Sequence, residues 1–217
     1  MSDGLSLADH ITLELRADII GGRLLPGKAL IEADLVLAYN ASRNTIREAL
    51  HRLGQEGLTR YVRHKGVMVR QPGADQVRDL FQVRRTLELQ GIAASRPLRE
   101  QQSNSMHEAI EAAQLARDRE DWRAVGTHSL HFHQLIVGLL GSSLLDEFFT
   151  NVVAQLRLVF SAAPDESRFQ APWLARDRLI YQRLIANDRP AALETLSTYL
   201  DDSEQQLLEV FNPGSRH

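Results

Sequence analysis

The residues best suited to chemistry in this sequence are arginine, asparagine and histidine side chains on one face of a short predicted helix. Apolar residues recur there at the i, i+3, i+4 and i+7 spacing of a single buried stripe, which consists of Ile46, Ala49, Leu50 and Leu53. At about 100° per residue the opposite face carries Asn44, Arg47, Glu48 and His51, with Arg43 on the flank at the helix start. Arginine can pair bidentately with guanine and asparagine with adenine, so this face is a candidate for reading the major groove of DNA. An ordinary amphipathic surface helix would show the same pattern.

Two earlier helices would position that face. Helical spacing of apolar residues predicts the first over 5–20. A second, short helix is predicted over 31–39, with Leu35 and Ala38 facing inward. Asn40 tolerates the left-handed conformation of a tight turn, and Ser42 is a favourable N-cap for the third helix. Two short helices joined in this way form a helix-turn-helix.

After residue 57 the apolar pattern changes to a period of two. Residues 58–62 and 66–70 are predicted to be the strands of a β-hairpin, and its basic tip is Arg63-His64-Lys65-Gly66. A hairpin that follows a recognition helix makes a winged helix, whose tip can contact phosphates. A plain edge hairpin with a solvated turn is the alternative.

The charge distribution supports a polyanionic partner. The chain of 217 residues has a net charge of -3, yet residues 41–70 hold seven basic side chains against Glu48 and Glu56. Such a concentration of positive charge in an acidic chain favours nucleic acid, although a basic solvated surface would have the same composition.

The remainder of the chain is predicted to be entirely helical. After a short linker at 71–74, helices are predicted at 75–96, 101–119, 121–139, 143–160, 173–187 and 190–211. Long amphipathic helices with short connections imply an antiparallel bundle, in which a ligand site lies between helices. The predicted fold is therefore mainly α. A winged helix-turn-helix domain with a small β-hairpin spans 1–70, and an all-helical antiparallel bundle spans 75–217.

Several classes of protein do not fit the sequence. It contains no cysteine, so disulfide scaffolds and thiolate zinc sites are excluded. No apolar run approaches the length of a membrane span, and the first ten residues lack the pattern of a secretory signal. We therefore expect a cytoplasmic protein without a membrane partner. Phosphate-binding glycine loops, the HExxH motif and the nucleophile elbow are also absent, so we do not expect an enzyme.

The first seventy residues resemble the GntR family of winged-helix regulators. The resemblance lies in Ile20–Leu30 (IGGRLLPGKAL), in Ala41–Leu53 (ASRNTIREALHRL) and in the wing glycine Gly66. It implies that Arg43 and Arg47 contact base edges or adjacent phosphates. Ser42 and Thr45 would then serve the DNA backbone, and Gly66 the wing contact. With Asn44, His51, His64 and Lys65, these residues form the predicted DNA-binding site. Asn44-Thr45-Ile46 departs from the Thr-Pro-Val common in the family, which would change the bases read.

The second part resembles the FCD ligand-binding domain of the FadR subfamily. The motifs are Val83–Glu88 (VRRTLE), Phe132-His133 with Gly141-Ser142, and Ala186–Ala192 (ANDRPAA). Many FCD domains bind a divalent metal through one Asp and three His. Carried over by position, these ligands fall on Ser129, His133, Asp177 and Tyr199. His133 and perhaps an oxygen of Asp177 remain as ligands, too few for a tight zinc site, so we expect no metal cofactor. His128 and His131 lie off the face set by His133.

FCD relatives commonly sense small carboxylates. Without a metal, Arg84 and Arg157 are candidates to hold the anion, since a guanidinium binds a carboxylate through two parallel hydrogen bonds. The predicted effector site also includes Ser129, His133, Asp177 and Tyr199. Alternatively, Arg84 and Glu88 form a structural pair at i, i+4.

These observations predict a DNA-binding transcriptional regulator that responds to a small organic effector, expected to be a carboxylic acid. Symmetry favours a homodimer on a palindromic double-stranded DNA operator. The alternatives are an architectural DNA-binding protein without an effector and a metal-dependent enzyme.

Overall fold

The computed structural model describes residues 5–162 and 165–211. The chain divides into two compact units, 1–72 and 73–217, called here the N-terminal unit and the C-terminal unit. The division falls within the stretch 71–74 that the sequence analysis assigns to a linker.

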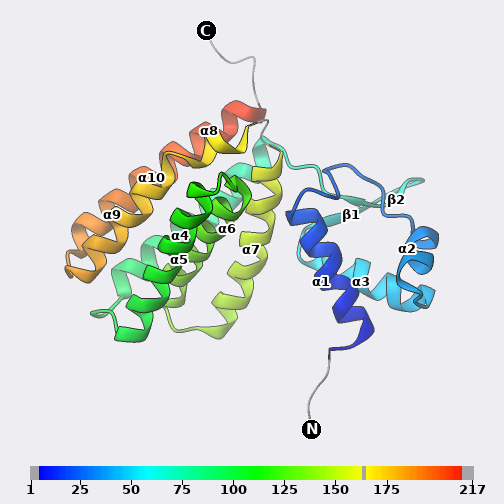
Figure 1. The fold of residues 1–217 in the computed structure, drawn as a ribbon, viewed down its shortest axis with the longest axis horizontal. Coiled ribbons are helices and arrows are strands. Elements are labelled where there is room, and N and C mark those ends of the chain that lie inside the picture. Colours follow the sequence, from blue (N-terminus) through cyan, green and yellow to red (C-terminus); the bar gives the residue numbers. More distant parts are fainter. Residues whose placement is uncertain (1–4, 163–164, 212–217) are drawn as a thin grey trace. The chain divides into compact units, whose positions relative to one another are not determined.

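The described residues of the N-terminal unit form three helices followed by an antiparallel hairpin (Figure 1). Its elements are α1 (Leu7–Ile20), α2 (Glu32–Tyr39), α3 (Arg43–Gln55), β1 (Thr59–Val62) and β2 (Gly66–Val69). Thr59 pairs with Val69 and Val62 with Gly66, which fixes the hairpin register. Helix α1 packs against α3, and buried apolar side chains of both helices form the core of the unit.

The turn between α2 and α3 has the predicted chemistry. Asn40 adopts the left-handed conformation, with φ 46° and ψ 45°. The Ser42 hydroxyl caps α3 by accepting a hydrogen bond from the Thr45 amide at 3.1 Å. The inward orientation predicted for Ala38 is wrong, because this residue is exposed and Leu35 is only half-buried. No residue of α2 is fully buried, so α2 contributes one partly covered face to its contact with α3.

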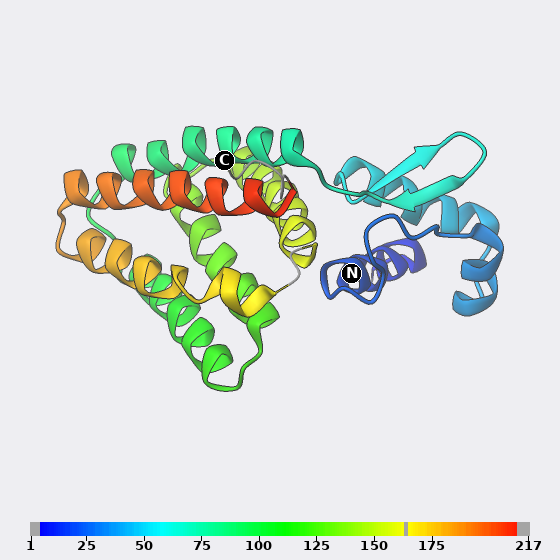
Figure 2. The same ribbon diagram turned by 90° about the horizontal axis from the view of Figure 1, so that it is seen from above.

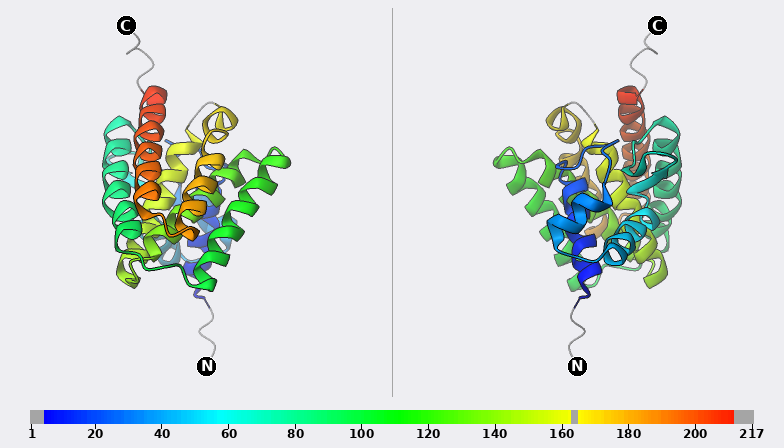
Figure 3. Two further views of the ribbon diagram at one scale, coloured as in Figure 1. Left: turned by 90° about the vertical axis from the view of Figure 1, so that its left-hand side faces the viewer. Right: turned by 90° about the vertical axis from the view of Figure 1, so that its right-hand side faces the viewer.

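The C-terminal unit is a bundle of helices. These are α4 (Ala74–Ala94), α5 (Glu100–Asp118), α6 (Trp122–Gly138), α7 (Ser143–Ser161), α8 (Glu166–Gln170), α9 (Trp173–Ile185) and α10 (Arg189–Phe211). Helices α4 and α10 lie side by side (Figure 2), as do α9 and α10 (Figure 3, left). Helix α6 is central, with neighbours α4, α5, α7, α8 and α9.

The sequence patterns predicted the long helices but not α8. This helix of five residues lies where only a break was expected, and the Asp165 side chain caps it by accepting a hydrogen bond from the Arg168 amide at 3.1 Å. One helical turn is too short to show apolar periodicity. Within the described residues, no helix combines the length and apolar character that crossing a membrane requires.

Candidate nucleic-acid interface and buried polar site

The start of α3 presents polar side chains around a capped helix N-terminus. Arg43 and Asn44 are exposed and form no ion pair or side-chain hydrogen bond with any described residue. The hydroxyls of Ser42 and Thr45 lie 2.8 Å apart. Helix N-termini favour anions, because their amide groups point outward along the macrodipole. This end of α3 is therefore suited to phosphate as well as to base edges.

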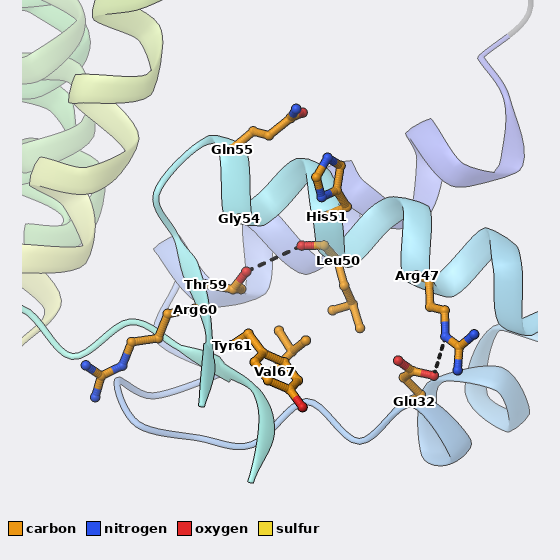
Figure 4. A pocket seen from close by; sticks show the side chains of 10 residues that line it. All are labelled: Glu32, Arg47, Leu50, His51, Gly54, Gln55, Thr59, Arg60, Tyr61 and Val67. Atoms are coloured by element: carbon orange, nitrogen blue, oxygen red, sulfur yellow. Dashed lines mark hydrogen bonds and ion pairs between the residues drawn. The ribbon is translucent and has the colours of Figure 1, made fainter. Parts of the chain in front are cut away.

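Arg47 lies one turn further along α3 and has a carboxylate partner on α2. Its Nε donates to Glu32 Oε2 at 2.9 Å, and the Arg47 side chain remains 61% exposed (Figure 4). An ion pair this exposed contributes little to stability. The guanidinium is consequently oriented by Glu32 and still accessible to DNA.

A groove of about 430 Å³ connects the exposed face of α3 with the hairpin (Figure 4). Arg47 and His51 line it from α3, and Arg60 and Tyr61 line it from β1. Tyr61 is 76% exposed. The sequence analysis did not include Arg60, Tyr61 or Glu32 among the predicted site residues. Their grouping depends on how the hairpin packs on α3, and no local sequence pattern encodes that packing.

The hairpin tip is exposed and basic. Arg63, His64 and Lys65 are exposed, and within the described residues none of them forms an ion pair. His64 and Gly66 have positive φ angles of 64° and 77°. A Cβ atom on Gly66 would meet nothing within 4 Å, so the positive φ rather than crowding inside the protein favours glycine.

One of the basic residues in 41–70 has a structural role instead. Arg52 binds Asp9 of α1 and also donates to Glu48 at 2.7 Å. A second link, from Arg16 Nε to Glu56 Oε2 at 2.7 Å, joins α1 to the end of α3. These ion pairs hold α3 against α1 and reduce the positive charge available to a partner.

The C-terminal unit contains a buried polar cluster at α6. We use this name for Arg84 and Glu88 of α4, Ser129 and His133 of α6, Asp177 of α9 and Tyr199 of α10. Arg84 Nε donates to Glu88 Oε1 at 2.6 Å, and the other Glu88 oxygen lies 2.6 Å from His133 Nδ1. The structural pairing of Arg84 with Glu88 is thus present.

Asp177 completes the cluster on the opposite side of the His133 ring. Its Oδ2 accepts a hydrogen bond from the Ser129 hydroxyl at 2.6 Å, and its Oδ1 lies 3.3 Å from His133 Nε2. The Tyr199 hydroxyl lies 3.5 Å from Ser129 Oγ, and the Tyr199 ring is 4.7 Å from the His133 ring. The buried polar cluster therefore contains every residue of the predicted effector site except Arg157.

The charges in the cluster shift one another's pKa values. Burial opposes the charged form of Glu88, but Arg84 and His133 outweigh it and lower the pKa of this carboxyl group. Burial likewise opposes the charged form of His133, yet Glu88 and Asp177 raise its pKa above the ordinary value. Burial and the charge of Asp177 raise the pKa of Tyr199. His133 is therefore favoured as an imidazolium between two carboxylates.

This arrangement does not fit a metal ion. A histidine ligand must offer an unprotonated nitrogen, whereas both nitrogens of His133 face carboxylates. The Ser129 hydroxyl is already used as a donor to Asp177. Among the described residues, no three His, Asp or Glu side chains converge as metal ligands. His128 is half-buried and His131 exposed, away from the cluster.

Arg84 Nη2 is buried and has no hydrogen-bond partner among the described residues. His133 Nε2 and Asp177 Oδ1 make no well-formed hydrogen bond either, but they lie 3.3 Å apart and form an ion pair with each other. Buried polar atoms are normally satisfied, because each unsatisfied one costs about 1–3 kcal/mol. The cluster therefore has one donor, Arg84 Nη2, available to a polar ligand.

Arg157 is also buried, but in different surroundings. Its Nη1 donates to Glu166 Oε1 at 2.8 Å, and its guanidinium lies 5.8 Å from the centre of the Phe160 ring. Gln170 of α8 is buried in the same region, where both side chains face Gly126 of α6. Sequence reasoning did not identify Gln170, because α8 had no detectable pattern. It did not identify Gly126 either, because the proximity of Gly126 to Arg157 and Gln170 depends on how separate helices pack.

Both units match known families. The family described as "Bacterial regulatory proteins, gntR family" matches residues 7–69, and the FCD domain matches residues 79–202. The curated HTH-type transcriptional repressor RspR of Escherichia coli (strain K12) is 23% identical to this chain over 203 residues, which cover 93% of this chain and 89% of the relative.

Two solved structures share the fold along most of the chain. A GntR transcriptional regulator from Rhodococcus sp. RHA1 is 35% identical with a TM-score of 0.90, and the match covers 98% of this chain and all of that one. E. coli McbR/YncC is 21% identical with a TM-score of 0.80, and the match covers 96% of this chain and all of that one. The second likeness concerns the fold alone.

Proposed function

This chain belongs to the GntR family of bacterial regulatory proteins and carries an FCD domain, as in the FadR subfamily. From this premise we propose that the N-terminal unit binds DNA and that the C-terminal unit binds the effector. It is an effector-responsive DNA-binding regulator of transcription. In our proposal it acts in the cytoplasm as a homodimeric repressor of a palindromic operator, and it has no catalytic role. Repression is the direction proposed because the relative RspR is named a repressor.

The proposed DNA contacts follow the exposed surface of the N-terminal unit. Base edges are read from α3 by Arg43, Asn44 and Arg47. Contacts to the DNA backbone come from Ser42, Thr45 and His51, and from the hairpin tip by His64, Lys65 and Gly66. The observation that carries this assignment is the continuous groove from Arg47 and His51 to the hairpin. Selection of duplexes from a random library, followed by affinity measurement, tests it by comparing the selected sequence with random DNA.

The hairpin tip is proposed to contact phosphate rather than bases. We expect Lys65→Ala to weaken binding to all DNA sequences alike and to reduce the slope of log affinity against log salt by about one unit, because one counterion fewer is released. Titrations at several salt concentrations measure this slope. Arg119→Ala, which removes one exposed charge from the C-terminal unit, is the matched control and should leave the slope unchanged. A loss restricted to the selected sequence would contradict phosphate contact.

The effector is proposed to be a small carboxylate in the buried polar cluster. The supporting observation is Arg84, which uses Nε to bind Glu88 and retains a buried, unpartnered Nη2. A charge-assisted hydrogen bond from this nitrogen suits a carboxylate. Calorimetry against a panel of organic acids tests the assignment, and binding that survives Arg84→Met unchanged would exclude it.

Effector control is proposed to act by linkage. In the proposed homodimer, each protomer supplies one N-terminal unit. An effector that binds better when these two N-terminal units have one relative placement shifts the equilibrium toward that placement. The operator affinity then changes by the same factor as the effector affinity. Neither an architectural DNA-binding protein nor a metal-dependent enzyme is favoured by the family assignment.

We propose that no metal takes part in effector binding. Elemental analysis of the purified protein should find no stoichiometric divalent metal, because His133 faces carboxylates through both nitrogens. The double variant His133→Ala, Asp177→Ala should have the same metal content as the wild type. A stoichiometric metal in the wild type that disappears in the double variant would overturn this proposal.

A further inference from the structure

The ion pair between Arg47 and Glu32 occupies only one of the three guanidinium nitrogens of Arg47. Arg47 Nε donates to Glu32 Oε2 at 2.9 Å, at the edge of the groove between α3 and the hairpin (Figure 4). The two terminal nitrogens, Nη1 and Nη2, donate to no described residue. They form a planar fork of N–H donors. The fork matches the O6 and N7 acceptors that guanine presents in the major groove.

The carboxylate of Glu32 has a defined position relative to α3. Glu32 is the first residue of α2, where the helix macrodipole favours a negative charge, and α2 packs against α3. Its side chain is 37% exposed and its recorded partner is Arg47 alone. The packing of α2 on α3 therefore determines where the Arg47 guanidinium is held.

The pair also has no net charge, and in this respect Arg47 differs from Arg43. Arg43 is exposed at the start of the same helix and forms no ion pair with any described residue. The free guanidinium fork can bind a phosphate as well as a guanine, so geometry alone does not separate the two. Attraction to phosphate depends on net charge, whereas the guanine acceptors are neutral and need only directed N–H groups. Glu32 thus weakens phosphate binding by Arg47 more than it weakens guanine binding.

Glu32 also restricts the motion of the arginine before DNA arrives. A long side chain that is free in solution loses rotamer freedom when it binds, and this loss opposes binding. Anchoring Nε removes part of that freedom in the unbound protein. An exposed pair of this kind adds little to the stability of the fold, so Glu32 can be replaced without unfolding the N-terminal unit.

We infer that Glu32 determines the base specificity of Arg47. It holds Nε, leaves Nη1 and Nη2 for O6 and N7 of a guanine, and makes phosphate the poorer alternative. Glu32 is a positioning residue, because it acts through Arg47 and contacts no base itself. This inference rests on the proposed base reading by Arg47, and it adds the base and the residue that selects it. The competing explanation is that Glu32 only repels DNA, as any acidic residue on this surface would.

The test compares Glu32→Ala with Asp34→Ala. Asp34 also lies in the first turn of α2, is exposed and forms no ion pair with a described residue. Both variants therefore remove one carboxylate from the same end of the same helix, but only Glu32→Ala releases Arg47. Competition titrations compare the selected operator with duplexes changed at the base pair whose preference Arg47→Ala relaxes. A uniform effect of charge cancels in this ratio of affinities.

We expect a guanine at that base pair, and we expect Glu32→Ala to lower the preference for it about tenfold, within the range of one bidentate contact. On random duplexes, Glu32→Ala should increase the slope of log affinity against log salt by about one unit, because the released Arg47 binds one more phosphate. Asp34→Ala should leave the preference and the slope unchanged. In an Arg47→Ala background, Glu32→Ala should not change the preference further, whereas a structural disturbance of α3 would still do so.

A preference that Glu32→Ala leaves intact would overturn this inference, and base reading by Arg47 would stand. An equal loss of preference in Asp34→Ala, or a base pair without guanine at that position, would overturn it in the same way. If Arg47→Ala relaxes the preference at no base pair, both the proposed base reading by Arg47 and the role of Glu32 are wrong.

Discussion

Arg47→Ala is expected to weaken binding to the selected operator by about 1–3 kcal/mol and to relax the preference for one base pair. This effect is expected because of where Arg47 lies on α3. The buried stripe of α3 fixes the helix against α1, and Arg47 projects from the opposite face with 61% of its side chain exposed. Glu32 holds the guanidinium near the groove that leads to the hairpin. Competition titrations with operator variants, each changed at one base pair, measure both effects.

Arg52→Ala provides the matched control for this prediction. It removes an arginine from the same helix, but Arg52 binds Asp9 and Glu48 and so connects α3 to α1. We expect it to lower stability while the base preference of the folded protein is retained. If Arg47→Ala weakened binding to the operator and to random duplexes equally, Arg47 would be a phosphate contact and its role in base reading would be excluded.

Glu88→Gln is expected to destabilise the C-terminal unit by about 3–5 kcal/mol, because it leaves a buried ion pair without one partner. Glu88 is fully buried and is the acceptor for both Arg84 and His133. The neutral amide preserves the shape of the side chain but removes the negative charge between two positive groups. Trp122 and Trp173 both lie in the C-terminal unit, so tryptophan fluorescence during denaturant unfolding reports on this unit alone.

Glu204→Gln is the corresponding control at a more exposed ion pair. Glu204 of α10 binds Arg85 at 2.6 Å, and the Arg85 side chain is 28% exposed. A loss of about 1 kcal/mol or less is expected there. Equal losses for Glu88→Gln and Glu204→Gln would show that the buried polar cluster does not depend on the charge of Glu88.

The effect of Glu88→Gln should depend on pH with a defined sign. Although burial acts against it, Arg84 and His133 lower the pKa of Glu88 below its ordinary value of 4.5. A carboxyl group with a lowered pKa stabilises the folded state above 4.5, and this contribution disappears as the pH falls through the folded-state pKa. The difference in unfolding free energy between wild type and variant should therefore shrink below pH 4.5. A difference that grew on acidification would contradict the lowered pKa.

The sequence alone predicted the elements whose signals are local. The i, i+3, i+4, i+7 stripe of α3, the left-handed turn at Asn40 and the Ser42 cap all depend on residues within one or two turns of each other. The same holds for the long helices of the bundle. Side chains on the outer face of α3 were identifiable for this reason, because a buried stripe on one side of a helix determines the exposed side.

Other features depend on contacts between segments far apart in the chain. Glu32 meets Arg47, and Arg60 and Tyr61 join the same groove, only through packing of α2 and the hairpin on α3. The exposure of Ala38 differed from its prediction because periodicity does not show how much of a short helix its neighbours cover. The resemblance to the FCD domain grouped Ser129, His133, Asp177 and Tyr199 as one predicted site. The hydrogen bonds of His133 with Glu88 and of Ser129 with Asp177 depend on tertiary structure.

The sequence by itself therefore determined a mainly helical chain with a basic winged helix-turn-helix near its start, since helical spacing, turn residues and charge are properties of neighbouring residues. Only the tertiary structure decided that Arg157 pairs with Glu166 beside Gln170 while Arg84 lies with His133. The physical reason is that burial and hydrogen bonding join residues from separate helices, and the free energy of an unpaired buried atom depends on every helix packed around it.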